Sequence, residues 1–468
     1  MKRYFFCWLI MAACSLAAAQ QRPRSAILDE ALYNSLPIKA GTLTRGYSTL
    51  PASASLKNYA PFPGDQGSYS TCTAWAAAYA ARTIAESVAV KRLDRTLTSG
   101  NVFSPAFVYK NISDDPACQK GTAIVWALDL IKNQGVPRRI GAELAADFKS
   151  VQTAMYRDSR KYPIAGYAAL FRYRRGETAD PAVKTQTVKK SLSEGKPVII
   201  GMNTPASFDT AKSPWTPKEN PQVNHGGHAM CVTGYDDSKY GGAFEVQNSW
   251  GDDWGDKGFI WIPYQVFGQF VYEAYEMIED LASYKDAAFY SGFVDIETDK
   301  SKAGMPVQFT REGYYRTVNS YPSGTRFRFI MGNNHPAYVY AFTADSLTSK
   351  TNLIFPLAEL NESPALDYTE SKVAWPGENE WIELDDIPGT DYLVVLYSKR
   401  ELDINAVRTR FERLRGGFAD RVSQAVGSDY TPSSYVRYDP GRIRFSGTLM
   451  NSKAVLGLLL AIDHKAGD

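Results

Sequence analysis

The sequence predicts an α+β domain over residues 49–283, followed by a mainly-β, sandwich-like domain over residues 284–468. Three observations predict this organisation: an Ala-rich, helix-forming run at residues 72–90, short strand-like runs after Pro197, and alternating strand patterns that dominate from residue 284 onward. A chain of 468 residues is also too long for one ordinary hydrophobic core. We therefore expect two folded domains.

The N-terminus has the pattern of a secretory signal peptide. MKRYFFCWLIMAACSLAAAQQ has a basic start, an apolar middle and an A-x-A end. We expect residues 1–19 to be the signal peptide and residues 20–48 to be a polar, irregular extension. A lipid anchor at Cys14 is a second interpretation, because residues 11–14 loosely resemble a lipoprotein box. No later stretch has the ~20 apolar residues of a transmembrane helix, so the protein is expected to be periplasmic or extracellular.

The first domain should begin with helices. Residues 72–90, CTAWAAAYAARTIAESVAV, are strong helix formers, and Ser70 or Thr71 is a suitable N-cap. An apolar residue recurs at every fourth position and gives this helix an apolar face: Ala76, Ala80, Ile84 and Val88. Two more helices are expected near residues 122–133 and 182–194.

Strands should follow the helices. After Pro197 the chain turns to short apolar runs between Gly- and Asp-rich turns: PVIIGM, HAMCVTGY, AFEVQNSW and GFIWIPY. A helical half followed by a β half predicts an α+β domain that ends near residue 283. Beyond it, alternating runs such as TRFRFIMGN, AYVYAFTAD and DYLVVLYSK predict a β-sandwich. A single helix over residues 403–426 is expected to interrupt these strands.

Charge and cysteine content narrow the function classes. The 52 Lys and Arg residues nearly balance the 50 Asp and Glu residues, which argues against a nucleic-acid partner. After removal of the signal peptide only Cys72, Cys118 and Cys231 remain. Three cysteines in a large exported protein do not make a disulfide framework, and at least one of them must be unpaired.

Cys72 is a candidate nucleophile because it stands where the loop QGSYST meets the predicted helix. Cysteine reacts as the thiolate, which the N–H groups and the positive dipole end of a helix N-terminus stabilise. His228 opens the strand HAMCVTGY, and Asn248 follows 20 residues later. The Asn248 amide oxygen could accept from one imidazole nitrogen and aim the other at the sulfur. Gln66 and the Cys72 backbone N–H could donate to an oxyanion.

The same residues also have purely structural interpretations. Cys72 could be a small buried side chain at a helix start, and His228 could be a core histidine on a strand. His225 and His228 form an H-x-x-H pair, but no third ligand stands at a recognisable spacing. A loop role for His225 is therefore favoured over a metal site.

Three blocks in this order resemble the papain-like cysteine peptidases: QGSYSTCTAWA, GHAMCVTGYDD and NSWGDDWGDKGFIWI. The resemblance covers about residues 50–280. It implies a two-lobed domain with a helical lobe and a β-barrel-like lobe. It also implies these roles: Cys72 as nucleophile, His228 as acid and base, Asn248 as the residue that orients the histidine, and Gln66 as oxyanion donor. Gly121 and Trp250 are expected at the substrate site, with Trp250 also shielding the His–Asn hydrogen bond.

The chain departs from the family pattern near the nucleophile. Tyr69, Ser70 and Thr73 replace a cysteine, a glycine and a tryptophan of the family signature, and Lys120 replaces a glycine. The resemblance therefore implies that Cys118 lacks its usual disulfide partner and stays unpaired unless it pairs with Cys231. The family's long inhibitory propeptide is expected to be absent, because only about 30 residues separate the signal peptide from the domain.

The resemblance predicts an exported cysteine peptidase, and an endopeptidase in particular, that acts on polypeptides without a metal or organic cofactor. The alternative is an inactive binding protein that acts through its cleft or its C-terminal domain. Acyl transfer of the transglutaminase kind is disfavoured, because it uses an aspartate where this chain has Asn248. The C-terminal region, with RFIMGNNHPAYVYAFTAD, resembles a β-domain attached to bacterial exported proteins, and its partner is not predicted.

Overall fold

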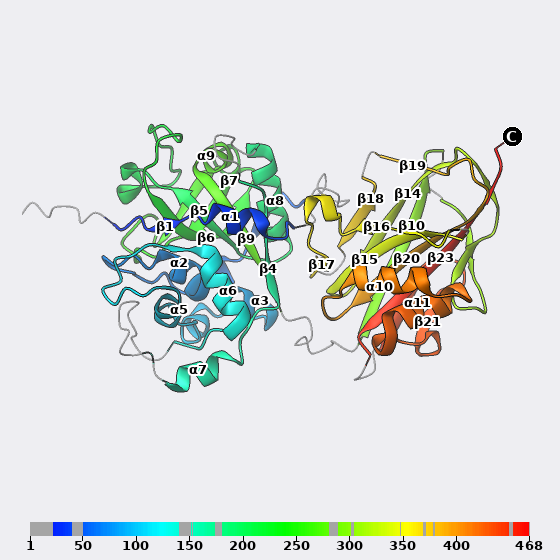
Figure 1. The fold of residues 1–468 in the computed structure, drawn as a ribbon. Coiled ribbons are helices and arrows are strands. Elements are labelled where there is room, and N and C mark those ends of the chain that lie inside the picture. Colours follow the sequence, from blue (N-terminus) through cyan, green and yellow to red (C-terminus); the bar gives the residue numbers. More distant parts are fainter. Residues whose placement is uncertain are drawn as a thin grey trace, which may run out of the picture.

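The computed structural model describes residues 22–39, 50–139, 151, 153–173, 180–279, 289–300, 304–346, 348–367, 371–377, 380–448 and 453–467. These residues form two halves that lie side by side (Figure 1). The expected signal peptide and Cys14 lie outside the described residues. Within the described ranges no helix is long and apolar enough to cross a membrane.

The first half contains the expected helix that starts at Cys72. It runs without interruption through α2 (Cys72–Ala74), a π-helical stretch η3 (Trp75–Arg82) and α3 (Thr83–Ala89). The expected apolar face is buried at Ala76, Ala80 and Ile84. The first fourteen residues of the helix are all buried as well, so the helix lies inside the domain and is covered on every side. Thr71 holds the N-cap position, but its side chain makes no capping hydrogen bond.

The other helices of this half lie close to their expected positions. The helix expected from residue 122 begins two residues later, because residues 122–123 form a short strand instead. The helices and short 3-10 turns are η2 (Lys57–Tyr59), α4 (Arg95–Ser99), α5 (Pro105–Ile112), α6 (Ile124–Gln134), α7 (Thr153–Ser159), α8 (Pro181–Ser193), η5 (Ala206–Thr210), η6 (Lys239–Gly241) and α9 (Tyr264–Phe270).

An antiparallel sheet forms the β lobe of the first half. Its strand order is β4-β9-β5-β6-β7-β8, and β2 pairs with β6. The strands are β2 (Ser53–Ser55), β4 (Gly166–Ala169), β5 (Val198–Asn203), β6 (Gly227–Asp236), β7 (Ala243–Gln247), β8 (Phe259–Pro263) and β9 (Val271–Ile278). His228 is the second residue of β6 and Asn248 directly follows β7, so two neighbouring strands place both residues at one edge of the sheet.

Residues 22–39, named the N-terminal segment here, are more ordered than expected. They contain strand β1 (Ala26–Ile27) and helix α1 (Glu30–Ser35), so the expectation of an irregular extension is wrong for this part of the chain. β1 pairs in parallel with β3 (Thr122–Ala123), next to the start of the Cys72 helix. Asp29 caps α1, because its carboxylate accepts from the Leu32 N–H.

The second half is the expected sandwich of two sheets. One sheet has the order β18-β14-β10-β22-β21 with β19 on β14; the other has the order β11-β12-β23-β20-β15-β16 with β13 on β23 and β17 on β15. The strands are β10 (Phe289–Thr298), β11 (Val307–Phe309), β12 (Tyr315–Thr317), β13 (Tyr321–Pro322), β14 (Arg326–Asn333), β15 (Ala337–Asp345), β16 (Thr351–Phe355), β17 (Ala365–Leu366), β18 (Lys372–Trp375), β19 (Ile382–Glu383), β20 (Gly389–Ser398), β21 (Val436–Tyr438), β22 (Arg444–Thr448) and β23 (Val455–Lys465).

Strand β15 is buried on both faces, because helices cover the outer side of its sheet. Val339 packs between the sheets, whereas Tyr340 packs toward the helices. The single helix expected over residues 403–426 is in fact two, α10 (Ile404–Arg413) and α11 (Phe418–Val426), and both lie on this outer face (Figure 1). Short 3-10 turns complete this half: η8 (Ala358–Leu360), η9 (Gly427–Asp429) and η10 (Ser433–Tyr435).

Candidate active site

Cys72 is the first residue of its helix, and its side chain is fully buried. The sulfur lies 3.6 Å from the Ser25 hydroxyl, and the neighbouring backbone of Ala229, Ser25 and Thr73 favours the thiolate. Burial raises the pKa of the Cys72 thiol above its ordinary value, and these donors offset part of that effect. Ser25 belongs to the N-terminal segment, so part of the cover over the sulfur comes from that segment.

His228 and Asn248 make the hydrogen bond that their positions in the sequence suggest. His228 Nε2 donates to Asn248 Oδ1 at 2.7 Å, and both side chains are buried. Asn248 Oδ1 also accepts from the Ser249 N–H at 2.8 Å, which fixes the orientation of the amide. The other ring nitrogen, Nδ1, has no hydrogen-bond partner within the described residues. Nδ1 therefore keeps a free lone pair, as a general base requires.

Trp250 covers this hydrogen bond. Its ring centroid lies 4.6 Å from that of His228 with an interplanar angle of 30°, and the ring is fully buried. Phe208 and Trp254 also pack against the indole, in edge-on contacts with ring centroids 5.6 and 5.5 Å away. This position fits shielding of the imidazole from water, and a direct contact between Trp250 and a substrate stays a prediction.

Gln66 links the loop before Cys72 to the Asn248 turn. Gln66 Oε1 accepts from the Ser249 hydroxyl at 2.7 Å, and Gln66 Nε2 donates to the Tyr69 carbonyl at 2.7 Å. An amide nitrogen carries two hydrogens, so a second N–H remains for another acceptor. The backbone N–H of Gln66 also donates to the Ser249 carbonyl, which holds the two loops together.

The N-terminal segment passes directly over the cysteine between two glycines. The Thr122 N–H donates to the Ser25 carbonyl at 3.2 Å. A Cβ on Gly121 would stand 2.3 Å from the Ser25 oxygen, and a Cβ on Gly227 would stand 2.1 Å from the Ala26 oxygen. The two glycines therefore provide the space in which an extended chain fits between the lobes.

Arg24 anchors the segment on the far side of the cysteine. Its guanidinium donates to an Asp209 carboxylate oxygen at 2.8 Å and to the Pro205 carbonyl at 3.2 Å. The Arg24 side chain is only 7% exposed. The aliphatic part of Arg24 lies against Gly226, two residues before His228.

Burial and charge keep His228 neutral under this cover. The pKa of His228 falls from 6.5 to about 4, chiefly because burial disfavours the imidazolium; the Asn248 hydrogen bond raises the pKa, and the Arg24 charge lowers it. With the thiol pKa raised as well, the covered site holds a neutral thiol and a neutral imidazole near pH 7. A thiolate–imidazolium pair requires that water regain access.

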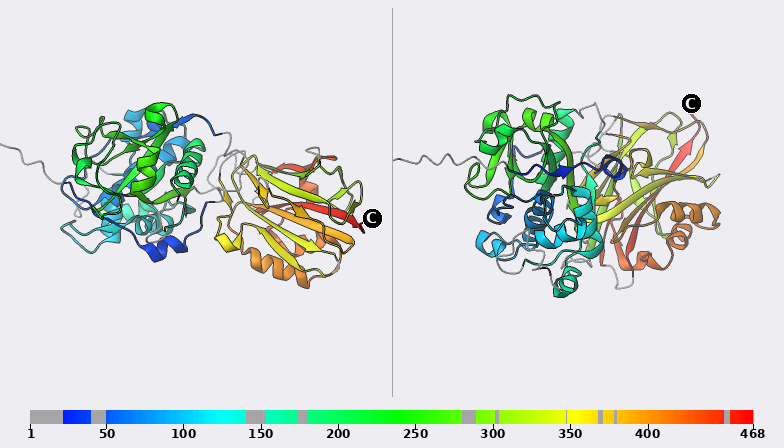
Figure 2. Two further views of the ribbon diagram at one scale, coloured as in Figure 1. Left: turned by 90° about the horizontal axis from the view of Figure 1, so that it is seen from above. Right: turned by 60° about the vertical axis from the view of Figure 1, so that its left-hand side comes forward.

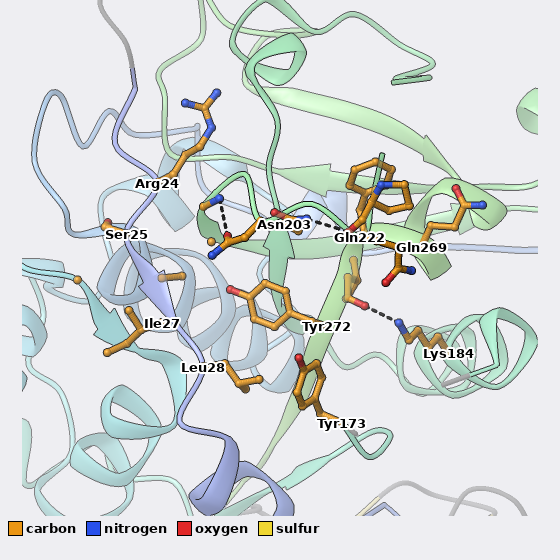
Figure 3. A pocket seen from close by; sticks show the side chains of 18 of the residues that line it. Arg24, Ser25, Ile27, Leu28, Tyr173, Lys184, Asn203, Gln222, Gln269 and Tyr272 are labelled. Carbon is orange, nitrogen blue, oxygen red and sulfur yellow. Dashed lines mark hydrogen bonds between the residues drawn. The ribbon is translucent and has the colours of Figure 1, made fainter. Parts of the chain in front are cut away.

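The N-terminal segment leaves part of the cleft open. A cavity of about 960 Å³ remains beside it. Tyr272 of β9 projects into this cavity between Ile27 of the segment and Lys184 of α8 (Figure 3). Lys184 donates to the carbonyls of Val271 and Gly268 at 2.6 and 2.8 Å, and burial lowers its pKa to about 8.

The remaining candidates lie apart from this cluster. In the part of the chain that the structure describes, Cys118 and Cys231 are buried and free, so the question left open for Cys118 is settled against pairing with Cys231. Burial raises the pKa of both thiols, that of Cys118 to about 11. His225 lies in a loop, where its ring nitrogen Nε2 is 2.9 Å from the Asn220 carbonyl oxygen.

The comparisons with known proteins agree with this architecture. The sequence model of the family described as "Papain family cysteine protease" matches residues 63–278. This part of the chain is a papain-family domain. An uncharacterized peptidase C1-like protein of Acanthamoeba polyphaga mimivirus is 30% identical over 227 residues, which cover 43% of this chain and 64% of that protein. The chain thus spans less than two thirds of the length of this curated relative.

Solved structures similar to the papain-family domain include two cysteine proteases. Xylellain from Xylella fastidiosa is 21% identical, with 56% of this chain and 98% of that chain covered and a TM-score of 0.43. The bromelain protease from Ananas comosus, solved with the E64 inhibitor, is 19% identical, with 49% and 99% covered and a TM-score of 0.38.

The sequence patterns missed Arg24 and Ser25, which contribute to the site from the N-terminal segment. One signal was available: Asp29 precedes the apolar residues Leu32 and Tyr33 at helical spacing, which is the pattern of a capped helix. Tyr33 is fully buried, and its hydroxyl donates to the Phe171 carbonyl at 2.7 Å. A buried aromatic residue so early in the chain indicates that the segment is part of the fold.

Proposed function

We propose that this protein is an exported cysteine peptidase, and an endopeptidase in particular, whose Cys72 is covered by its own N-terminal segment. The observation that carries the proposal is the site around Cys72: a helix-terminal cysteine beside Ala229, and an imidazole oriented by Asn248 with a free Nδ1. The papain-family match over residues 63–278 supports peptide hydrolysis. The signal peptide expected at residues 1–19 supports export.

In the proposed reaction the Cys72 thiolate attacks a peptide carbonyl carbon, and the carbonyl electrons move onto the oxygen. The second amide N–H of Gln66 and the Cys72 backbone N–H stabilise that oxyanion. His228 in its protonated form gives its proton to the leaving amine, which leaves a thioester on Cys72. His228 then removes a proton from water, the water oxygen attacks the thioester, and the thiol is released with the acid product. Asn248 holds the imidazole in position in both steps.

The N-terminal segment acts as an inhibitor in this proposal, rather than as a substrate. The Ser25 hydroxyl lies 3.6 Å from the Cys72 sulfur, whereas the Ser25 carbonyl oxygen accepts from the Thr122 N–H. For cleavage, the electrophilic carbon of a peptide carbonyl must lie next to the Cys72 sulfur. The Ser25 hydroxyl that lies there is not an electrophile and cannot be attacked. In place of the long inhibitory propeptide, which is expected to be absent, residues 22–39 serve as a short inhibitory segment in this proposal.

One experiment tests the proposed function. Peptide-library hydrolysis is measured for the mature protein before and after limited proteolysis of the N-terminal segment, with a Cys72→Ala variant treated identically. We expect hydrolysis to rise after removal of the segment and to be absent in Cys72→Ala at an unchanged melting temperature. A segment-free protein that binds peptides without cleaving them would instead support the inactive binding protein.

A further inference from the structure

The C-terminal β-domain makes backbone hydrogen bonds with the end of the N-terminal segment. The Ile38 N–H donates to the Asn361 carbonyl at 2.8 Å, and the Ser363 N–H donates to the Ile38 carbonyl at 2.8 Å. Ile38 and Glu362 thereby form a parallel bridge. Residues 360–363 of the second half thus serve as a strand edge for the segment.

The papain-family domain supplies the opposite edge. The Lys39 N–H donates to the Ala169 carbonyl at 2.8 Å, and the Ala169 N–H donates to the Pro37 carbonyl at 2.9 Å. Ala169 is the last residue of β4, so the segment continues that sheet by one short strand. Residues 37–39 therefore lie between the two halves and are hydrogen-bonded to both. Figure 2 shows α1, which directly precedes them, at the junction of the halves.

The side chain of Asn361 adds hydrogen bonds to the C-terminal end of α1. Its backbone is left-handed, with φ at 49°, and its amide nitrogen donates to the Ser35 and Leu36 carbonyls at 3.0 Å each. These are carbonyls at the C-terminal end of α1, where a helix lacks internal donors. Arg172 of the papain-family domain contacts both the segment and the C-terminal domain, because its guanidinium donates to the Leu36 and Leu360 carbonyls.

A buried ion pair joins the two halves directly. Lys196, in the loop before β5, pairs with Asp367 of the C-terminal domain, and both side chains are largely buried. Lys39 of the segment forms a second buried cluster with Glu194 and Glu276. Buried ion pairs are costly to separate, so they fix the relative position of the partners.

We propose that the C-terminal β-domain is the binding module for the N-terminal segment: residues 360–363 hold residues 35–38 and so keep Ser25 over Cys72. This role rests on the proposed function, because the segment that it holds is the one that closes the cleft. Helix α1 connects the two ends of the segment, and the buried Tyr33 makes that helix rigid against the sheet. Loss of the backbone hydrogen bonds at Ile38 therefore weakens the hold on the segment, and Ser25 covers Cys72 for less of the time.

Asn361→Gly tests this role in the full-length protein. Glycine accepts the left-handed backbone but removes both amide hydrogen bonds to α1. Ser349→Gly is the matched control, because Ser349 is also left-handed (φ 58°) and lies in a turn of the same domain. The readouts are hydrogen exchange of residues 24–39 and the rate of Cys72 alkylation by iodoacetamide, neither of which requires peptidase activity.

In Asn361→Gly we expect hydrogen exchange along residues 24–39 and alkylation of Cys72 to become faster by on the order of tenfold, as two lost hydrogen bonds predict. Ser349→Gly should leave both rates unchanged. Arg172→Met is the second variant, used if Asn361→Gly lowers the melting temperature of the whole chain; it should accelerate both rates in the same direction.

Two results would overturn the role of the C-terminal domain. In one, neither variant changes exchange or alkylation. In the other, exchange accelerates only at residues 35–39 while Cys72 alkylation stays constant, so that the two ends of the segment are independent. Neither result depends on hydrolysis. A failure of the proposed peptidase activity would appear separately: the protein without the segment would be alkylated at Cys72 but would cleave no peptide.

Discussion

The Ser25 hydroxyl of the N-terminal segment lies 3.6 Å from the Cys72 sulfur, and the Cys72 side chain is fully buried. A residue of the N-terminal segment thus limits access to the sulfur. The strength with which the segment is held there should set how fast Cys72 reacts with any reagent.

Arg24→Met should open the site. The Arg24 pair with Asp209 is largely buried, and hydrogen bonds to charged groups contribute about 1.5–3 kcal/mol. We expect iodoacetamide to label Cys72 about 10- to 100-fold faster than in the wild type. Arg22→Met is the control, because the Arg22–Asp65 pair is exposed and contributes at most about 1 kcal/mol. Equal labelling rates for the two variants would contradict the anchoring role of Arg24.

Acid should release the N-terminal segment. The pKa of His228 is about 4 under the cover and 6.5 when unperturbed, so protonation favours the uncovered site. The His228 contribution to holding the segment is fully present above pH 6.5 and is lost as the pH falls toward 4. It amounts to at most about 3 kcal/mol, because Trp250 also buries His228 and stays in place when the segment leaves. Hydrogen exchange of residues 24–27, corrected for intrinsic pH dependence, should show this change.

Substitutions at the two histidines check the origin of the pH effect. His228→Gln cannot titrate in this range, so its exchange profile should be flat between pH 4 and 6.5. His225→Gln, which removes the loop histidine, should keep the wild-type profile. A pH profile that survives in His228→Gln would assign the effect to another group.

Asn248→Ala should impair catalysis after removal of the segment. The substitution removes the acceptor that fixes His228 Nε2 at 2.7 Å, so the free nitrogen loses its orientation. We expect kcat to fall at least tenfold and up to about 10⁴-fold, the scale known for loss of an orienting residue, with little change in KM. Asn248→Asp keeps an acceptor oxygen and should lose less activity. Equal kcat in all three proteins would exclude the orienting role.

Glu273→Gln should stabilise the papain-family domain increasingly as the pH rises from 4.5 to 8. Glu273 is fully buried, accepts from the Tyr275 hydroxyl, and has no partner for Oε1 within the described residues. Burial raises the pKa of Glu273 to about 8. The carboxyl is therefore neutral in the fold below pH 8. Its stabilising contribution is complete below pH 4.5 and is lost as the pH rises to 8, a loss of about 5 kcal/mol.

Thermal unfolding at several pH values measures this effect. The melting temperature of Glu273→Gln should match the wild type near pH 4.5 and exceed it increasingly up to pH 8. A constant difference between the two proteins across this range would show that Glu273 does not titrate in the fold.

The sequence was sufficient for the fold class, and it placed His228 and Asn248 where they form a hydrogen bond. The blocks that contain Gln66, Cys72, His228 and Asn248 are local, and each places its residue at the end of a helix or strand. The His228–Asn248 hydrogen bond was expected from this placement. The catalytic roles of these residues stay predictions until the variants are measured.

The cover over Cys72 could not be predicted, because tertiary contacts fix it. β1 has only two residues and α1 has six, so neither contains enough positions for a periodic pattern.

In the second half, the break between α10 and α11 could have been predicted from the sequence, because Gly416 and Gly417 interrupt the apolar spacing. The burial of β15 on both faces depends on helices that come much later in the chain.

The position of residues 37–39 between Ala169 and Ser363 has a consequence for the activated protein. When the segment leaves, its backbone no longer satisfies the edge of β4 or the N–H and C=O groups of residues 361–363. Unpaired strand edges invite pairing with other chains. Under the proposed function, full activation would therefore create two new sites for self-association or aggregation.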